Sequence, residues 1–478
     1  MSSENKPNIL LFVTDGMQAR TLEQGHGCLT PTIDGLIGRG VHLTRAHTPL
    51  PTCSPARASL MTGLLPHNHG VVEVEHGVDA DQCVLREEHP HWAQRLRDTG
   101  YATGYFGKWH VERTGELNRF GWDTFDIRGA RSHANASQKG LAVDDSLDPD
   151  TVRMYQGPDG YNDTLKYAVT DVPADDRAIG GPAGLARDWL GERDEQPWCC
   201  VVSYYEPNES LIVGRDAYEQ YDVENLKLPE TLRDDLSDRP NIYQRDQQIW
   251  QDVSDDEWRK ILACYYGRIT ELDGQVKRVL DKLEETGALE NTVVIFTADH
   301  GRYVGGHGLE AHNFGAFEEI YAIPLVIAGP GVVEGVSTDA LVGFHDIGPT
   351  ILDLAGAEQL DVSDSASFAE LLSDPSGGRD RSGYAEYFGS RFRLTQRIYW
   401  EDEWKFVFNG FDFDELYNLV EDPLETRNLA SIPEHADRVK HMMTGIWRRM
   451  HETGDTTLLN SHYHSMRFAA VGPNTGNE

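Results

Sequence analysis

The sequence predicts an α/β protein: a mostly parallel central sheet sandwiched by helices, with a smaller C-terminal α+β subdomain that contains an antiparallel sheet. Short apolar runs alternate with helical patterns along residues 1–380, which is typical of parallel sheets covered on both faces. At residues 381–478 the pattern changes to alternating strands followed by one helix. With 478 residues, the chain is long enough for one large domain and a smaller one.

The larger unit opens with NILLFVTD at residues 8–15, an apolar run that predicts a buried strand ending in a carboxylate. The longest helical pattern covers residues 255–287, where apolar side chains recur along one stripe. Further strands are expected at 101–110, 198–207, 292–299 and 323–331, and further helices at 30–40, 89–100 and 346–356.

The smaller unit is predicted from period-two alternation. Its expected strands are 383–388, 396–409 and 414–419, and its expected helix is 433–450. Residues 130–165 and 207–250 are rich in Asp and Gly and weakly periodic, so we expect long loops over the functional site there.

Three polar side chains directly follow predicted strands of the large sheet. Asp15 ends the first run, and Asp299 and His300 end TVVIFTADH. In open α/β sheets, ligands bind where the carboxyl ends of the strands open onto loops. The sequence therefore predicts a site at this edge of the sheet.

The charge of the chain excludes some partners. The formal net charge is −35, spread along the sequence, with 10 lysines against 33 arginines. This composition suits a protein that stays hydrated at high salt, and we hypothesise a salt-adapted, halophilic source. The charge argues against nucleic acid or an acidic membrane as partner. No run is long enough for a membrane span and no signal peptide is visible, which favours a cytoplasmic location.

The cysteines point to one unusual position. None of the six forms a C-x-x-C pair, which argues against a zinc knuckle. Cys199, Cys200 and Cys264 lie in apolar runs and are expected to be reduced core residues. Cys53 lies in polar, loop-like surroundings, where a cysteine could fill the core, bind a metal, form a disulfide or act as a nucleophile.

The segment CSPARASLMTG, which begins at Cys53, matches the C-x-P-x-R signature of the type I sulfatases, the formylglycine-dependent branch of the alkaline phosphatase superfamily. GYATGYFGKWH at 100–110 is similar to the second signature of that family. The resemblance continues through TVVIFTADHG and DELYNLVEDPLETRNLA and so covers nearly the whole chain. It implies an alkaline phosphatase-like fold and a sulfuric ester hydrolase that cleaves an organic sulfate monoester to alcohol and inorganic sulfate.

The resemblance also implies that a formylglycine-generating enzyme oxidises Cys53 to formylglycine (3-oxoalanine), an aldehyde. A hydrated aldehyde carries two hydroxyls on one carbon. One attacks sulfur, and deprotonation of the other expels sulfate and regenerates the aldehyde. The signature proline and arginine would then serve partly as a recognition tag for the modifying enzyme.

By the same resemblance, Arg57 braces the modified residue, Lys108 contacts formylglycine and sulfate, and His110 is the base of the elimination. Asp15, Asp299 and His300 look like the ligands of a metal, Ca²⁺ or Mg²⁺, since oxygen-rich sets suit these ions. Cations placed in advance are what a transition state with charge on nonbridging oxygens requires.

Three positions depart from the family pattern. Gly16 stands where many members have a second acidic or amide residue, so water or a neighbour such as Gln18 would complete the metal shell. Asn208 stands where a histidine commonly contacts the sulfate or leaving-group oxygen, and an amide donates a hydrogen bond but is a poor acid. The usual lysine is missing near His312, which, if protonated, is our candidate substitute.

Two alternatives follow from these departures. The first is a phosphonate monoester or phosphodiester hydrolase on the same scaffold, and the second is a catalytically weak binding pseudoenzyme. The expected substrate is a small-molecule or carbohydrate sulfate ester. The sequence leaves the particular ester and the oligomeric state open.

Overall fold

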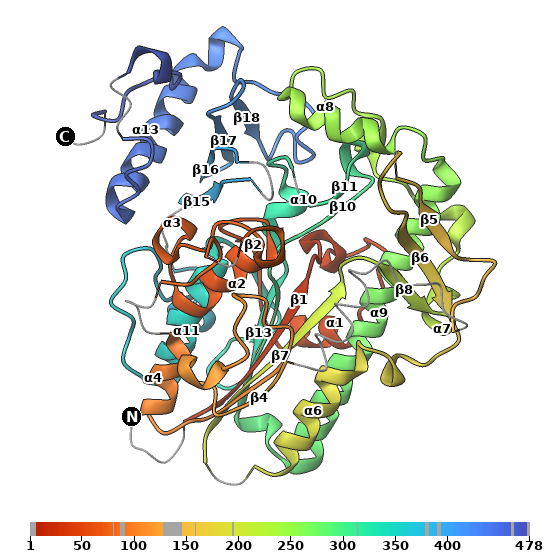
Figure 1. The fold of residues 1–478 in the computed structure, drawn as a ribbon. Helices are drawn as coiled ribbons and strands as arrows, with labels where there is room; N and C mark the ends of the chain where they lie inside the picture. The colour runs from red at the N-terminus through yellow and green to blue at the C-terminus, as the bar shows by residue number, and fades with distance from the viewer. Residues whose placement is uncertain are drawn as a thin grey trace.

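The structure is a computed structural model, and it describes residues 6–79, 81–86, 91–127, 146–157, 159–193, 196–312, 314–377, 382–389, 393–459 and 463–475. Its centre is a nine-stranded sheet in the order β12-β2-β13-β9-β1-β7-β3-β4, with β14 paired to β2 (Figure 1). The strands are β1 Asn8–Asp15, β2 Gly40–His47, β3 Ala102–Gly107, β4 Thr124–Asp126, β7 Trp198–Pro207, β9 Thr292–Ala298, β12 Ala322–Ile323, β13 Leu325–Ala328 and β14 Val336–Gly343.

Helices cover both faces of this sheet, as the sequence predicts (Figure 1). On one face lie α2 (Cys53–Thr62), α4 (Trp92–Asp98) and α11 (Ile347–Leu354). On the other lie α1 (Pro31–Gly38), α6 (Gly180–Gly191) and α9 (Asp255–Thr286). Successive residues of β1 point to opposite faces, so Leu11 packs in one core and Phe12 in the other.

The sheet is mostly parallel, which confirms the predicted fold class. β1 pairs in parallel with β7 and β9, and β3 does so with β7 and β4. The strand predicted at 323–331 is the exception, because β13 runs antiparallel to both β9 and β2. An apolar run identifies a buried strand but carries no signal for its direction.

The C-terminal part contains the expected antiparallel sheet, ordered β15 (Ser382–Tyr387), β16 (Gln396–Glu401), β17 (Trp404–Asn409) and β18 (Glu415–Asn418). Helix α13 (Ala436–Thr453) packs against it through a core that includes Phe406 and Ile446. The boundary at 380/381 stays a prediction, because it falls outside the described residues.

The segments expected to be loops hold a second, small sheet. It is made of β5 (Arg153–Tyr155), β6 (Thr164–Thr170) and β8 (Leu211–Gly214). The expectation of loops was wrong at β5, at β8 and at the first two residues of β6, because the apolar stretches there are only a few residues long. Residues 130–145 and 158 of the first segment lie outside the described residues.

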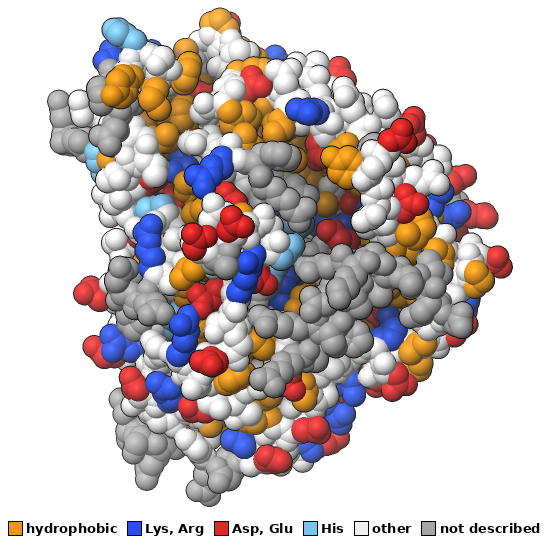
Figure 2. Space-filling view, viewed as in Figure 1, with side chains coloured by type: hydrophobic (Ala, Val, Ile, Leu, Met, Phe, Trp, Pro, Cys, Tyr) orange, Lys and Arg blue, Asp and Glu red, His pale blue; other side chains and the backbone are white. Residues whose placement is uncertain are grey.

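The described helices include none that is long and apolar enough to cross a membrane. On the face drawn in Figure 2, acidic side chains are scattered among basic ones and form no single block. The cytoplasmic location and the salt-adapted source stay predictions.

Candidate active site

The carboxyl ends of β1 and β9 bring together residues from opposite halves of the chain. The strands pair in parallel up to Thr14 and Ala298, and the Asp299 backbone N–H donates to Thr14 O at 3.0 Å. Asp15 and Asp299 therefore lie side by side, and both are fully buried. The predicted convergence at this edge of the sheet is present in the structure.

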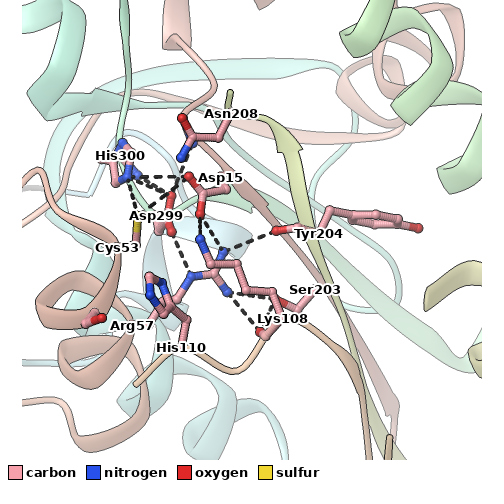
Figure 3. A network of polar contacts seen from close by, with 12 residues as sticks. Asp15, Cys53, Arg57, Lys108, His110, Ser203, Tyr204, Asn208, Asp299 and His300 are labelled. Atoms are coloured by element: carbon pink, nitrogen blue, oxygen red, sulfur yellow. Dashed lines mark hydrogen bonds and ion pairs between the residues drawn. The ribbon is translucent and has the colours of Figure 1, made fainter. Parts of the chain in front are cut away.

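Cys53 is the first residue of α2, directly after the N-cap residue Thr52. Its Sγ atom lies 3.7 Å from Asp15 Oδ1 and 3.3 Å from His300 Nε2 (Figure 3). The N-terminus of α2 adds partial positive charge at this point, which favours an anion. The end of β1, the start of α2 and the segment after β9 thus meet at Cys53.

The thiol of Cys53 is poorly suited to act as a nucleophile itself. Burial and the nearby Asp299 carboxylate raise the pKa of the thiol well above its usual value. Catalytic cysteines instead depend on a lowered pKa, because the thiolate is the reactive form. None of the described cysteines forms a disulfide, so a cross-link does not account for Cys53 either.

His300 presents one ring nitrogen to the cluster. Its Nδ1 lies 2.7 Å from Gly301 O, and since a carbonyl only accepts, Nδ1 carries the proton. The lone pair of Nε2 then faces Asp15 and Asp299, whose nearest oxygens are both 3.6 Å away. Burial lowers the pKa of His300, so the imidazole is neutral and available as a ligand.

Arg57 forms hydrogen bonds to several segments that build the site (Figure 3). It lies one turn after Cys53 in α2, is buried, and donates from Nε to Asp299 Oδ2 at 2.7 Å. Its Nη1 donates to Ser203 Oγ at 2.7 Å and to Lys108 O at 3.2 Å. The guanidinium therefore links α2 to β7 and to the segments that follow β3 and β9, and the buried charges are paired.

Lys108 follows β3, and its Nζ contacts Asp15 Oδ2. Burial lowers the pKa of the ammonium to about 8, against the opposing effect of Asp299 and other carboxylates. Nζ also lies 5.0 Å from the centre of the Tyr205 ring. A buried cation thus lies beside the carboxylates before any substrate is present.

His110 has a left-handed backbone, with φ of 51°, which few non-glycine residues adopt. Its Nε2 is 3.1 Å from His76 Nδ1, while its Nδ1 has no hydrogen-bond partner in the described part of the chain. Burial and the neighbouring Lys108 lower the pKa of His110 well below its usual value. The imidazole is therefore neutral and able to accept a proton.

The donor set fits a divalent metal. One ligand atom each from Asp15, Asp299, His300 and Cys53 can be chosen so that all four lie within 4.8 Å of one another. Two carboxylates and a neutral imidazole form a set suited to hard or borderline cations. The structure therefore places the predicted ligand side chains together, and both their role as metal ligands and the identity of the ion stay predictions.

The Gly16 backbone N–H donates to Asp299 Oδ1 at 3.3 Å, while the Gly16 carbonyl and the Gln18 side-chain NH₂ bond to residues outside the cluster. The Gly16 carbonyl accepts from Tyr265 Oη at 2.9 Å, and the Gln18 side-chain amide donates to Arg302 O at 2.5 Å. Gly16 has φ of 73°, and a Cβ there would lie 3.7 Å from Asn208, so the two residues are neighbours.

The two residues predicted to bind substrate border the cluster. Asn208 lies beyond Asp15 and His300, while the His312 ring stacks on His300 with centroids 4.0 Å apart. His312 Nδ1 lies 3.0 Å from Pro51 O and so carries the proton. Burial and His300 lower the pKa of His312 to about 3, so the expected protonated His312 is not supported: the ring is neutral at neutral pH.

Two side chains outside the predicted set organise the site. Ser203, within β7, accepts from Arg57 Nη1 and donates to Lys108 O, both at 2.7 Å. Arg302, two residues after His300, is fully buried and contacts Asn208. The position of Arg302 shortly after β9 was the available signal for that residue, whereas Ser203 lies within β7, and neither residue belongs to a motif.

Comparison with known families agrees with this geometry. The family model described as Sulfatase matches residues 7–357. A second model, described as N-sulphoglucosamine sulphohydrolase, C-terminal, matches residues 305–452. The two matches together cover both the large sheet and most of the C-terminal part.

Individual relatives extend over most of the chain. A choline-sulfatase of Rhizobium meliloti (strain 1021) is 28% identical over 455 residues, covering 90% of this chain and 83% of the relative. An arylsulfatase of Clostridium perfringens (strain 13 / Type A) is 26% identical over 470 residues, covering 91% of this chain and 93% of the relative.

Solved structures share the fold. A complex with the substrate D-glucosamine-2-N,6-O-disulfate has a TM-score of 0.74 at 20% identity, and the match covers 95% of this chain and 99% of that one. A phosphonate monoester hydrolase of Agrobacterium radiobacter has a TM-score of 0.77 at 23% identity, covering 94% and 96%.

Proposed function

The chain belongs to the sulfatase family and is a sulfatase enzyme, and on this premise we propose that it cleaves an organic sulfate monoester to an alcohol and inorganic sulfate. The observation that carries the proposal is the buried cluster around Cys53. It combines a residue at a helix N-terminus, two adjacent carboxylates, a neutral histidine and two cations. This is an arrangement for binding a tetrahedral anion and stabilising charge on its oxygens.

Cys53 is proposed as the precursor of formylglycine, made by a formylglycine-generating enzyme. The raised pKa of its thiol supports this reading, since the unmodified side chain is a weak nucleophile. When present, the hydrated aldehyde supplies the nucleophilic hydroxyl and a route for sulfate release.

Asp15, Asp299 and His300 are proposed to hold Ca²⁺ or Mg²⁺. When bound, the metal supplies Lewis-acid stabilisation of charge on sulfate oxygens. Arg57 keeps Asp299 ionised and in place, because its Nε donates to Asp299 Oδ2. Lys108 contacts Asp15 through its Nζ and places an ammonium in the site for the sulfate.

His110 is proposed to move a proton. Its Nδ1 is the atom without a partner among the described residues, so this nitrogen can accept a hydroxyl proton from residue 53 during sulfate release. The bond between Nε2 and His76 fixes the plane of the ring. Asn208 and neutral His312 lie next to His300, where they can contact the sulfate or the departing oxygen.

The substrate class follows from the relatives only as a proposal. One relative is named a choline-sulfatase and another an N-acetylglucosamine-6-O-sulfatase, so small-molecule and carbohydrate sulfates are both to be tested. Asn208 and His312 add no positive charge to the site, which favours a singly charged sulfate ester over a doubly charged phosphate monoester.

The test compares protein that contains formylglycine, verified by mass spectrometry, on a matched aryl sulfate and aryl phosphonate monoester with added Ca²⁺ or Mg²⁺. We expect a larger kcat/KM for the sulfate. A dominant phosphonate rate would instead support the alternative hydrolase, and no turnover of either ester would contradict the proposal.

A further inference from the structure

We propose that Arg302 is a positioning residue that fixes the Asn208 side chain with its amide nitrogen turned toward the cluster around Cys53. The inference rests on the proposed function, in which Asn208 contacts the sulfate or the departing oxygen. It assigns a task to a buried arginine that the reaction itself does not use.

The orientation of the amide follows from its two partners. Asn208 Oδ1 accepts from Arg302 Nη1 at 2.6 Å and from the Glu209 backbone N–H at 2.9 Å. A guanidinium and a backbone N–H can only donate, so an amide turned the other way would face two donors with its own NH₂. The nitrogen therefore points away from Arg302, toward Asp15 and His300 (Figure 3). Asn208 is thus restricted to donating a hydrogen bond toward the cluster around Cys53.

Both the side chain and the backbone of Arg302 are held by hydrogen bonds. It is fully buried, its Nε donates to Glu310 Oε1 at 3.1 Å, and its Nη2 contacts the same oxygen. Its Nη1 also contacts Glu209 Oε2. The backbone carbonyl of Arg302 accepts from Gln18 Nε2 at 2.5 Å. A side chain fixed at both ends can impose one geometry on its neighbour.

Arg302 acts through orientation, since its charge is already balanced. Lys166 pairs with the second oxygen of Glu310, so this network contains two cations and two carboxylates, Glu209 and Glu310. Each of the three guanidinium nitrogens already donates to a side chain. Arg302 is therefore no substitute for a cation that touches the sulfate. A lysine at this position would keep the charge but could not form the same fork.

A double-mutant cycle tests this. The variants are Arg302→Lys, Asn208→Leu, which removes the donor at similar size, and both together. The measurements are kcat/KM for an aryl sulfate with formylglycine-containing protein, and the dissociation constant of inorganic sulfate by calorimetry. We expect each single variant to lose roughly tenfold, the size of one hydrogen bond to a charged group. The double variant should be no worse than Asn208→Leu alone.

The matched control is Arg397→Lys, which changes a fully buried arginine paired with Asp455 in the C-terminal part. It should leave kcat/KM and sulfate affinity unchanged. Losses that multiply in the double variant, or an Arg302→Lys protein that matches the control, would overturn the inference. If the parent hydrolyses no ester, the proposed function fails, and the sulfate affinities still decide the role of Arg302. A parent that neither hydrolyses esters nor binds sulfate would overturn both.

Discussion

His300 Nε2 lies 3.3 Å from Cys53 Sγ, with its lone pair directed into the cluster by the bond from Nδ1 to Gly301 O. Cys53, which is proposed to be modified, is therefore in contact with His300, which is proposed to bind the metal. Both side chains are buried. Because both are fixed by ordinary strand, helix and backbone contacts, the site is largely formed before any ligand arrives. The contributions of the metal, the base and the nucleophile can therefore be tested one at a time.

The first prediction concerns the metal. Asp15→Asn should abolish the stabilisation of the fold by added Ca²⁺ and lower kcat by at least roughly 100-fold, because a ligand is lost and Lys108 loses its buried partner. Thermal unfolding with Ca²⁺ or EDTA and steady-state kinetics measure both effects.

The control is Asp273→Asn, which changes a buried carboxylate that accepts from the Thr32 and Ile33 backbone N–H groups. That variant should keep the response to Ca²⁺. An Asp15→Asn protein with an unchanged response would show that the metal does not bind this carboxylate.

The pH dependence of kcat/KM provides a second prediction. The base form of His110 is the neutral one, and burial with the neighbouring Lys108 lowers its pKa well below 6.5. Activity should therefore hold as the pH falls to 6.5 and decline only below it. An acid limb centred at or above 6.5 would contradict the assignment. His110→Ala should cost roughly 100-fold or more and remove the limb.

A buried ion pair connects α3 (Pro66–His69) to the C-terminal sheet. His67 Nδ1 lies 2.6 Å from Glu386 Oε1, and His67 Nε2 lies 3.1 Å from Thr453 O. Burial would lower the pKa of His67, but the hydrogen bond and charge of Glu386 raise it to about 9.

Because the folded-state pKa is raised, this stabilisation is fully present below pH 6.5 and is lost as the pH rises through about 9. The free energy of unfolding of His67→Gln should be lower than that of the parent by up to about 3 kcal/mol at pH 6. The difference should shrink by pH 10. Urea unfolding across this range measures it, and a difference independent of pH would contradict the ion pair.

The net charge of −35 leads to a prediction about salt. Raising KCl from 0.1 to 1 M shortens the screening length from about 10 to about 3 Å and should raise the melting temperature by reducing repulsion among surface carboxylates. Buried pairs such as Arg57–Asp299 are screened much less and should persist. Full stability and activity without added salt would count against a salt-adapted source.

The sequence predicted those parts of the fold and site that depend on local pattern. Asp15 and Asp299 were placed together because each follows an apolar strand, and parallel strands end at the same edge. The antiparallel direction of β13 could not be read, because the pattern of an apolar run is the same in both directions. The neutral state of His312 and the contact between Arg302 and Asn208 depend on packing between distant segments. Neither can be inferred from the spacing of residues within one segment.

The central claim is that Cys53 is converted to formylglycine, which supplies the nucleophile of a sulfatase. One measurement tests this claim most directly. Protein coexpressed with a formylglycine-generating enzyme is compared with protein made without it, by peptide mass spectrometry around residue 53 and by aryl sulfate hydrolysis. We expect the modified peptide to be about 18 Da lighter, the change of a thiol to an aldehyde. We also expect kcat/KM to rise in proportion to the modified fraction. Equal hydrolysis by fully unmodified protein would contradict the account.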